Sequence, residues 1–137
     1  MGGGGSFMYA MHHPELFSSA CPLSSYIGPL TVEDLKKRNA RRDFNYSDKE
    51  VTAYFERHNA LELLKSVSEE DLKSIRWYID CGDDDYLFEG TSLMHIAMTK
   101  KKIPHEYRVR DGGHNWTYWR EALPTVLEFV ADTFHKN

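Results

Sequence analysis

The sequence predicts an α/β domain with about three mostly parallel strands and flanking helices. Residues 75–80 form a β-rich run closed by Cys81-Gly82, residues 90–102 have a helical pattern, and residues 105–110 alternate as a strand does. Strand, helix and strand in this order form a βαβ unit, so the two strands should be parallel and joined by a right-handed crossover. The length of 137 residues suits one domain with a modest core.

Two elements are predicted before this unit. Residues 6–13, SFMYAMHH, should form a helix that is apolar on most sides, which indicates burial within the protein. Pro14 ends this helix because proline lacks an N–H donor and restricts the residue before it. The small residues 19–24, SACPLS, are expected to form a buried strand with Pro22 near its end.

The middle of the chain is polar and rich in turns. Within residues 26–45, only a short helix beginning near Thr31 is expected. Ser47-Asp48-Lys49-Glu50 has the Ser-x-x-Glu form of a capping box and should start a second helix. Residues 60–65 predict another helical turn or two. The helix after the capping box should have one apolar face, formed by Val51, Tyr54 and Phe55.

The remaining elements belong to the βαβ unit or follow it. Charged side chains alternate with apolar ones along residues 105–110, which suits an outer strand better than one buried on both faces. A last helix is predicted roughly over residues 118–134, and Pro124 either kinks it or marks a late start. The helix over residues 90–102 should turn Leu93, Ile96 and Ala97 inward, and the last helix Leu123, Val126, Leu127 and Val130.

Composition and charge argue against several classes of protein. The net charge is −4 with both signs mixed, so no basic face points to nucleic acid. The apolar runs are far shorter than the ~20 residues of a membrane-spanning helix, and no signal-peptide pattern is visible. Neither nucleic acid nor membrane is therefore an expected partner. Cys21 and Cys81 form no C-x-x-C motif, and free thiols are favoured over a disulfide.

Two loops should lie beyond the carboxyl ends of the parallel strands, where α/β proteins bind their ligands. They are residues 82–85, Gly-Asp-Asp-Asp, and residues 111–114, Asp-Gly-Gly-His. An aspartate after one strand and a histidine after the next can form a hydrogen-bonded dyad. In such a dyad the carboxylate orients the imidazole and the histidine acts as a general base.

The same residues have other interpretations. Carboxylates and imidazole also bind metal ions, but consecutive residues such as Asp83, Asp84 and Asp85 rarely converge on one ion. A solvated acidic turn is a further interpretation of Asp83 and Asp84. No metal site is predicted, and His114 with an aspartate of this loop remains the candidate catalytic pair.

Several stretches share the pattern of one family. They are MGGGGSFMYAMHHPELFSSACPLSS at the start, then CGDDD at 81–85, DGGHNW at 111–116 and YWR at 118–120. This series resembles the putative-esterase branch of the α/β-hydrolase superfamily, which includes feruloyl esterases and acetyl xylan esterases of carbohydrate esterase family 1, and S-formylglutathione hydrolases. The resemblance covers nearly the whole chain and is weakest over residues 26–70.

The resemblance implies a carboxylic ester hydrolase with a Ser-Asp-His triad. The family's C-G-x-x-D motif assigns the acid to Asp85, and its G-G-H-x-W motif assigns the base to His114. The family's nucleophilic serine would stand directly before Met1, whose backbone nitrogen would belong to the oxyanion hole. Residues 1–137 are accordingly expected to be a partial domain, the C-terminal portion of an α/β-hydrolase fold. No metal or organic cofactor is implied.

The glycines at residues 2–5 have two interpretations. A laboratory linker has this composition, but the residues after the glycines continue the family pattern without a break, which favours native glycines. Gly2 would then be the last glycine of the nucleophile turn, where a side chain would collide with a neighbouring strand.

The substrate implied by the resemblance is a small-molecule or carbohydrate ester, including acyl or feruloyl esters of carbohydrates. Trp116, Tyr118 and Trp119 either stack on a sugar or aromatic acyl group, or are core aromatics of the last helix. The alternative function is a non-catalytic remnant or assembly module that keeps the fold without activity. Because residues 19–24 would lack a flanking strand, we expect their free edge to favour a homo-oligomer.

Overall fold

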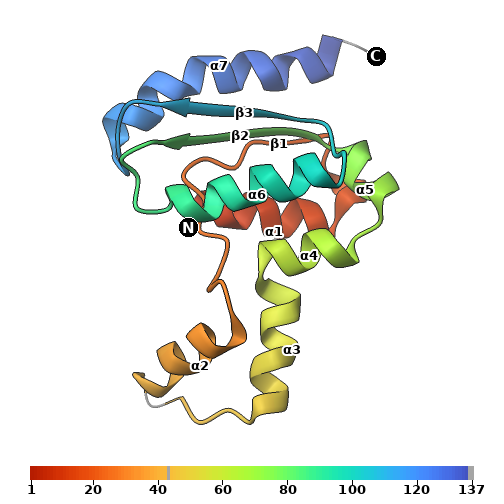
Figure 1. Cartoon of the computed structure of the whole chain (residues 1–137). Helices are drawn as coiled ribbons and strands as arrows, with labels where there is room; N and C mark the ends of the chain where they lie inside the picture. The colour runs from red at the N-terminus through yellow and green to blue at the C-terminus, as the bar shows by residue number, and fades with distance from the viewer. Residues whose placement is uncertain (43, 136–137) are drawn as a thin grey trace.

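The computed structural model describes residues 1–42 and 44–135, and it has the predicted α/β architecture. Three parallel strands form one sheet in the order β1-β2-β3: β1 is Ser19–Ala20, β2 is Arg76–Gly82 and β3 is His105–Arg110. Helix α7 (Trp116–His135) covers one face of the sheet, and α1 (Gly2–His12) and α6 (Phe88–Lys100) cover the other (Figure 1). No helix among the described residues is long and apolar enough to cross a membrane.

The central strand β2 supplies both layers of the core. Its alternate side chains, Trp77 and Ile79, pack with α1 and α6 in the main hydrophobic cluster, where the Trp77 and Phe7 rings stack 5.9 Å apart. Tyr78 points to the opposite face and packs against Phe129 of α7. A strand buried on both faces explains why this run is apolar almost without interruption.

The two outer strands differ in how well they were predicted. The expected outer strand at residues 105–110 is confirmed, since β3 pairs only with β2 among the described strands. Strand β1 is shorter than the predicted 19–24: Ser19 and Ala20 pair with β2, and after Pro22 only a single bridge joins Leu23 to Asp80. Proline has no N–H for the ladder, which accounts for the interruption.

Helix α1 begins at Gly2 and not at Ser6, because its glycines allow close packing. A Cβ atom on Gly3 would lie 2.1 Å from the carbonyl oxygen of Leu23, and one on Gly4 would lie 2.3 Å from that of Tyr26. The expectation that Gly2 occupies the tight position is wrong within the described chain, since nothing lies within 4 Å of a Cβ there.

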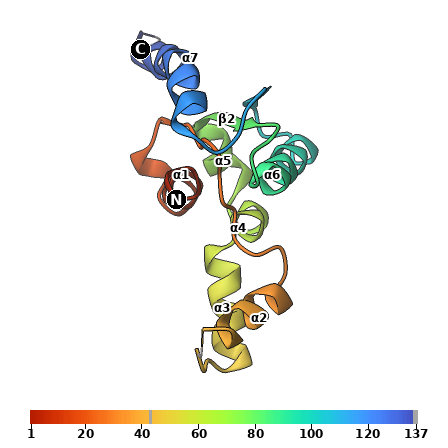
Figure 2. The ribbon, with the colours of Figure 1, turned by 90° about the vertical axis from the view of Figure 1, so that its left-hand side faces the viewer.

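Helices α2 (Val32–Ala40) and α3 (Asp48–His58) form an arm that projects from the sheet layers (Figure 2). The predicted capping box is confirmed, because Ser47 and Glu50 exchange both hydrogen bonds. The arm has its own small core of Leu35, Val51 and Phe55. Tyr54 lies outside this core, exposed to solvent, so its predicted inward position is wrong.

Two short helices connect the arm to β2, a 3-10 turn lies between α1 and β1, and two of the predicted inward faces need correction. Helix α4 (Ala60–Ser66) was expected, whereas α5 (Glu69–Ser74) and the 3-10 turn Pro14–Leu16 were not. Helix α6 buries Thr91, Met94 and Met98, and Ala97 packs partly buried against the core as predicted. Leu93 is only half-buried and Ile96 is exposed, because both sides of the helix are apolar and the sheet selects the methionine side. Pro124 lies inside α7, which buries Val126 but leaves Leu123 and Leu127 exposed.

Candidate active site

The loops after β2 and β3 lie side by side at the carboxyl ends of the strands. The backbone N–H of Asp83 donates to the Arg110 oxygen at 3.1 Å, and that of Asp84 donates to the Gly112 oxygen at 3.1 Å. The Gly112 N–H in turn donates to the Asp83 carboxylate at 3.1 Å. These bonds continue the β2–β3 ladder into the loops and hold them in one register.

Two glycines make this close approach possible. A Cβ atom on Gly82 would lie 1.9 Å from the Gly112 carbonyl oxygen, which is backbone and cannot rotate away. Gly112 has a φ of +131°, a conformation that side chains rarely adopt, and a Cβ there would meet the Tyr118 ring at 2.9 Å. The two loops therefore need glycine at both positions.

The loops bring together Asp85 and His114. Asp85 has a fully buried side chain, and its Oδ1 accepts a hydrogen bond from the Leu87 N–H at 2.9 Å. His114 Nδ1 lies 3.0 Å from Oδ2 and 3.2 Å from Oδ1 of this carboxylate. Because an ionised carboxylate only accepts hydrogen bonds, Nδ1 carries the hydrogen and Nε2 keeps its lone pair. This arrangement prepares Nε2 to accept a proton.

Aromatic rings frame the His114 imidazole on two sides. The Tyr86 ring lies 4.7 Å from it, and the Trp119 ring meets it edge to face at 4.8 Å. Trp119 is itself fixed, because its Nε1–H donates to Ser24 Oγ at 2.9 Å. With 23% of its side chain exposed, His114 remains accessible to a substrate.

The side chain of His114 lines a pocket of about 390 Å³ between α7 and the start of α1. Its wall contains Met1, Trp116 and Trp119, the other residues that the sequence singled out, together with Cys21 and Ser24. Burial raises the pKa of the Cys21 thiol to about 11, so at neutral pH it is a thiol and not a nucleophilic thiolate.

A second pocket of about 400 Å³ also has Met1 in its wall. Tyr26, His58 and Tyr86 line it, so Tyr86 contacts His114 and also faces this pocket. The start of α1 thus contributes to the walls of both pockets.

The other residues considered from the sequence, two aromatics and the exposed aspartates, lie outside the Asp85–His114 contact. Trp116 is 70% exposed and contacts Trp119 edge to face at 5.4 Å, whereas Tyr118 is buried in the core. The acidic trio Asp83, Asp84 and Asp111 is exposed, with carboxylate oxygens within 4.8 Å of one another. Asp85 is directed to His114 and is not part of that trio.

A buried cluster beside these loops was not predicted from the sequence. Asp80 is fully buried on β2 and contacts Tyr78, Arg110 and Tyr118. An acidic residue within the apolar run WYIDCG was the available signal, because a buried carboxylate needs donors nearby.

Comparisons with known proteins place the chain among esterases. Residues 1–130 match the family described as "Putative esterase". An acetyl esterase from Caldicellulosiruptor saccharolyticus is 23% identical, and the match covers 96% of this chain and 52% of the relative.

Solved structures agree with this match. A ferulic acid esterase is similar with 30% identity and a TM-score of 0.76, over 98% of this chain and 48% of that one. The S-formylglutathione hydrolase from Staphylococcus aureus shares the fold with 22% identity and a TM-score of 0.68, over 93% and 46% of the two chains. The chain thus spans about half the length of the relatives it matches.

Proposed function

The chain belongs to the esterase family described as "Putative esterase", and from this premise we propose that it supplies the acid and the base of a serine carboxylic ester hydrolase. The observation that carries the proposal is the contact of His114 Nδ1 with the buried Asp85 carboxylate, at 3.0 Å, beside an open pocket. A base held in one tautomer by a buried acid is the arrangement that activates a serine hydroxyl.

In this mechanism His114 transfers one proton in each of two half-reactions. Its Nε2 takes the proton of the serine hydroxyl as the oxygen attacks the ester carbonyl, and a tetrahedral oxyanion forms. The imidazolium then gives this proton to the leaving alcohol as the carbonyl re-forms and the acyl-enzyme remains. Water then attacks the acyl-enzyme, and His114 takes one of its protons and gives it to the serine oxygen as the carboxylic acid leaves. Asp85 keeps Nδ1–H oriented and stabilises the imidazolium throughout.

The start of α1 is the proposed place of the nucleophile and the oxyanion hole. The family pattern puts the serine immediately before the position of Met1, which lines the same pocket as His114. The Met1 backbone nitrogen lies at the N-terminus of α1, where N–H groups and the helix dipole favour negative charge. Ser6 also lines the pocket, but its hydroxyl donates to the Gly2 oxygen at 3.0 Å.

The proposed substrates are small-molecule or carbohydrate esters. Trp116 and Trp119 expose aromatic surface beside His114, and such surface stacks on a sugar ring or an aromatic acyl group. The names of the relatives, acetyl esterase and ferulic acid esterase, agree with acyl or feruloyl esters of this kind.

A hydrolysis assay tests the proposal. The 137-residue chain is compared, with p-nitrophenyl acetate as substrate, with a version extended at its N-terminus by a family-type elbow ending in Gly-x-Ser. We expect turnover by the extended version and only slow background hydrolysis by the short one. Turnover by the short chain that His114→Ala abolishes would contradict the proposed nucleophile. An inactive extended version that folds would favour the non-catalytic alternative.

Substitutions in the extended version test the two assigned roles. His114→Ala should lower kcat by at least about 1,000-fold, as loss of a triad base does elsewhere. Asp85→Asn should be comparably severe because the amide favours the wrong tautomer. Asp84→Asn is the matched control, since this neighbouring carboxylate is exposed and should be dispensable. A larger loss with Asp84→Asn than with Asp85→Asn would shift the assignment of the acid by one residue.

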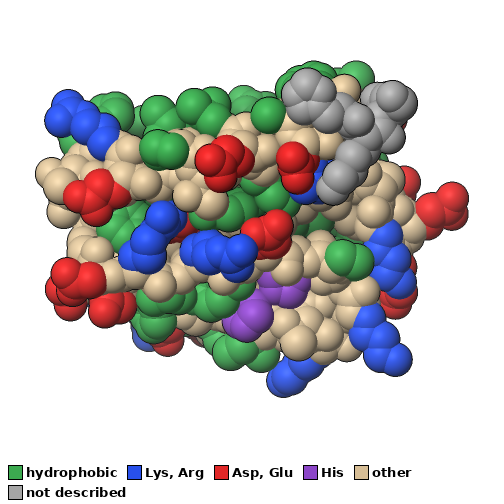
Figure 3. All heavy atoms as spheres, turned by 90° about the horizontal axis from the view of Figure 1, so that it is seen from above, with side chains coloured by type: hydrophobic (Ala, Val, Ile, Leu, Met, Phe, Trp, Pro, Cys, Tyr) green, Lys and Arg blue, Asp and Glu red, His purple; other side chains and the backbone are tan. Residues whose placement is uncertain are grey.

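We also propose that copies of this chain associate through the β1 side. Within the described residues no strand flanks β1 there, and Leu123, Leu127 and Phe134 of α7 are exposed. Figure 3 shows hydrophobic side chains in a row along the edge of the molecule formed by α7. An open strand edge beside apolar surface favours pairing with a second copy. Sedimentation over a concentration series should reveal dimers or larger species, and Leu127→Glu should weaken them; a monomer at every concentration would refute this.

A further inference from the structure

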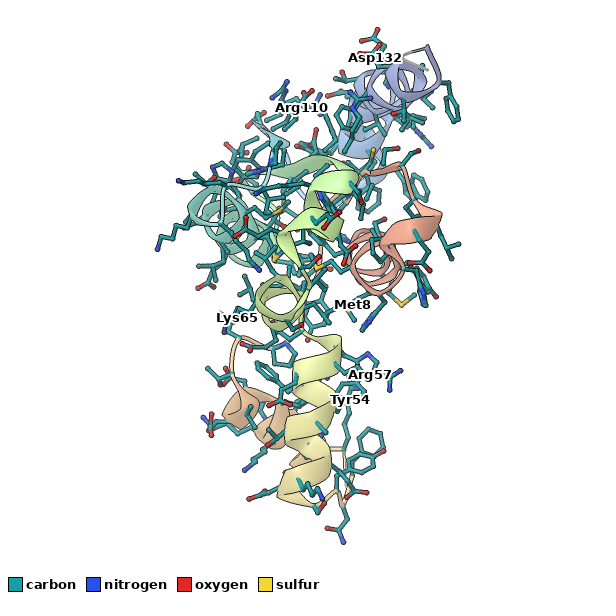
Figure 4. The ribbon with its side chains drawn as sticks, turned by 90° about the vertical axis from the view of Figure 1, so that its right-hand side faces the viewer. Met8, Tyr54, Arg57, Lys65, Arg110 and Asp132 are labelled. Carbon is teal, nitrogen blue, oxygen red and sulfur yellow. The ribbon has the colours of Figure 1, made fainter. Side chains whose placement is uncertain are left out.

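A buried carboxylate joins three elements just behind the candidate active site. Asp80 Oδ1 accepts a hydrogen bond from the Tyr118 hydroxyl at 2.5 Å, and Oδ2 accepts one from the Tyr78 hydroxyl at 3.1 Å. Oδ2 also forms an ion pair with Arg110. Figure 4 shows Arg110 on the side of the sheet that α7 covers. Strands β2 and β3 and helix α7 thus meet at one side chain.

The buried carboxylate of Asp80 requires these hydrogen-bond and ion-pair partners. A fully buried carboxylate is costly unless charged or polar donors surround it, and here three donors converge on two oxygens. Burial, and secondly the charge of Asp80, raises the pKa of Tyr78 to about 12, so this phenol remains a donor at neutral pH. Burial raises the pKa of Tyr118 as well.

Two of the three partners of Asp80 stand on the two sides of the loop that carries His114. Arg110 is the last residue of β3, four positions before His114, and Tyr118 is in the first turns of α7, four positions after it. Asp80 itself stands five positions before Asp85 along the chain. We infer that Asp80 is a positioning residue that fixes the 111–115 loop through Arg110 and Tyr118 and so holds the His114 imidazole against Asp85.

The inference deepens the proposed function, on which it rests for the role of His114, but its geometry can be tested without turnover. It also differs from a general role in stability. Arg76 joins β2 to α7 in a comparable way, donating to the Phe129 oxygen at 2.9 Å and to Thr133 Oγ1 at 2.8 Å. That junction lies at the opposite end of β2, so its loss should loosen α7 without reaching the His114 loop.

The imidazole tautomer of His114 is the measurement. Long-range ¹H–¹⁵N spectra of the 137-residue chain, recorded above the pH at which its imidazoles titrate, distinguish the Nδ1–H form from the Nε2–H form that a free imidazole prefers. The wild-type chain and Arg76→Met should both show His114 as Nδ1–H. Asp80→Asn should shift His114 to a mixture with a substantial Nε2–H population.

Tyr118→Phe keeps the test decisive if Asp80→Asn does not fold. This change removes one hydroxyl and keeps the ring, so it should fold and give a smaller shift in the same direction. An unchanged tautomer in folded Tyr118→Phe and in any folded Asp80→Asn would overturn the inference. So would an equal shift in Arg76→Met, which would show that any loosening of α7 has this effect. A tautomer that responds only to the Asp80 junction supports positioning whether or not the esterase assay succeeds.

Discussion

The arm of α2 and α3 and the sheet with α7 are stabilised in different ways. The arm depends on contacts between residues close in sequence: Thr31 caps α2 by accepting a hydrogen bond from the Asp34 N–H, and Ser47 and Glu50 cap α3. The sheet region depends on contacts across long stretches of chain, such as Asp80 with Tyr118, 38 positions apart. All the candidate catalytic residues lie in the second region. Capping patterns in the local sequence thus specify the helices of the arm, whereas the site depends on contacts between residues far apart in the chain.

The largest effect is expected from Gly82→Ala in the sheet region. The added Cβ would lie 1.9 Å from the Gly112 carbonyl oxygen, so one of the two site loops must move. We expect a loss of about 3 kcal/mol in the free energy of unfolding, measured with urea, and loss of the Nδ1–H signal of His114. Gly5→Ala is the control, since its Cβ would meet only Tyr9 at 3.8 Å, and it should be neutral or stabilising.

Leu35→Ala should break the arm and spare the sheet. Leu35 is fully buried in the small cluster with Val51 and Phe55, and its truncation should cost about 3 kcal/mol there. Limited proteolysis should then cut within residues 32–58, while the His114 tautomer is unchanged. Leu72→Ala, in the main core, should instead destabilise the sheet region. If both variants unfold the whole chain together, the two regions are one cooperative unit.

Ser47→Ala should have a smaller effect, confined to α3. The change removes the side chain that accepts from the Glu50 N–H, and N-cap losses of this kind cost about 1 kcal/mol. Amide exchange should accelerate in the first turn of α3. Ser74→Ala, which loses only a bond to the Asp71 oxygen within α5, should leave the exchange of α3 unchanged.

Mild acid should weaken the arm by a still smaller amount. Hydrogen bonds from the side chain and then the backbone of Ser47 lower the pKa of Glu50 below its usual value. A carboxyl with a lowered folded-state pKa contributes stability above its ordinary pKa of about 4.3 and loses it as the pH falls further. The protection factors of the α3 amides, which compare their exchange with the intrinsic rate at each pH, should therefore fall below this pH in the wild type. The fall should be smaller in Ser47→Ala, and an equal response in both would contradict the assignment.

The same division explains what the sequence could predict. Ser47 and Glu50 located the start of α3, and the alternation of residues 105–110 predicted the bounds of β3, because these patterns are local. Helix α5 was missed because EEDLKS has one apolar residue, Leu72, and its burial depends on distant chain. The predicted inward side of α6 was wrong because the helix is apolar on both sides, and Met94 and Met98 compete with Leu93 and Ile96 for the buried position.

The candidate site was partly predictable for a similar reason. Parallel strands bring their carboxyl ends together, so the strand pattern alone brings the loops of Asp85 and His114 to one edge. Two partners of Asp80, Arg110 and Tyr118, come from β3 and α7, and nothing near Asp80 in the sequence indicates them. The flanking aromatic Tyr86 was likewise missed, since ring contacts depend on how the loop folds.

The glycine turn of α1 should be the last part of the pocket wall to fold. Each glycine disfavours helix by about 1 kcal/mol relative to alanine, and Met1 provides no side-chain cap. Phe7 and Met11 can nucleate the later turns early through the main core, whereas Gly3 and Gly4 gain only from contact with Leu23 and Tyr26. In pulsed hydrogen exchange during refolding, the Gly5 N–H, which donates a hydrogen bond to the Met1 carbonyl oxygen, should gain protection after the Met11 N–H. Gly2→Ala, with open space around its Cβ, should shorten that delay.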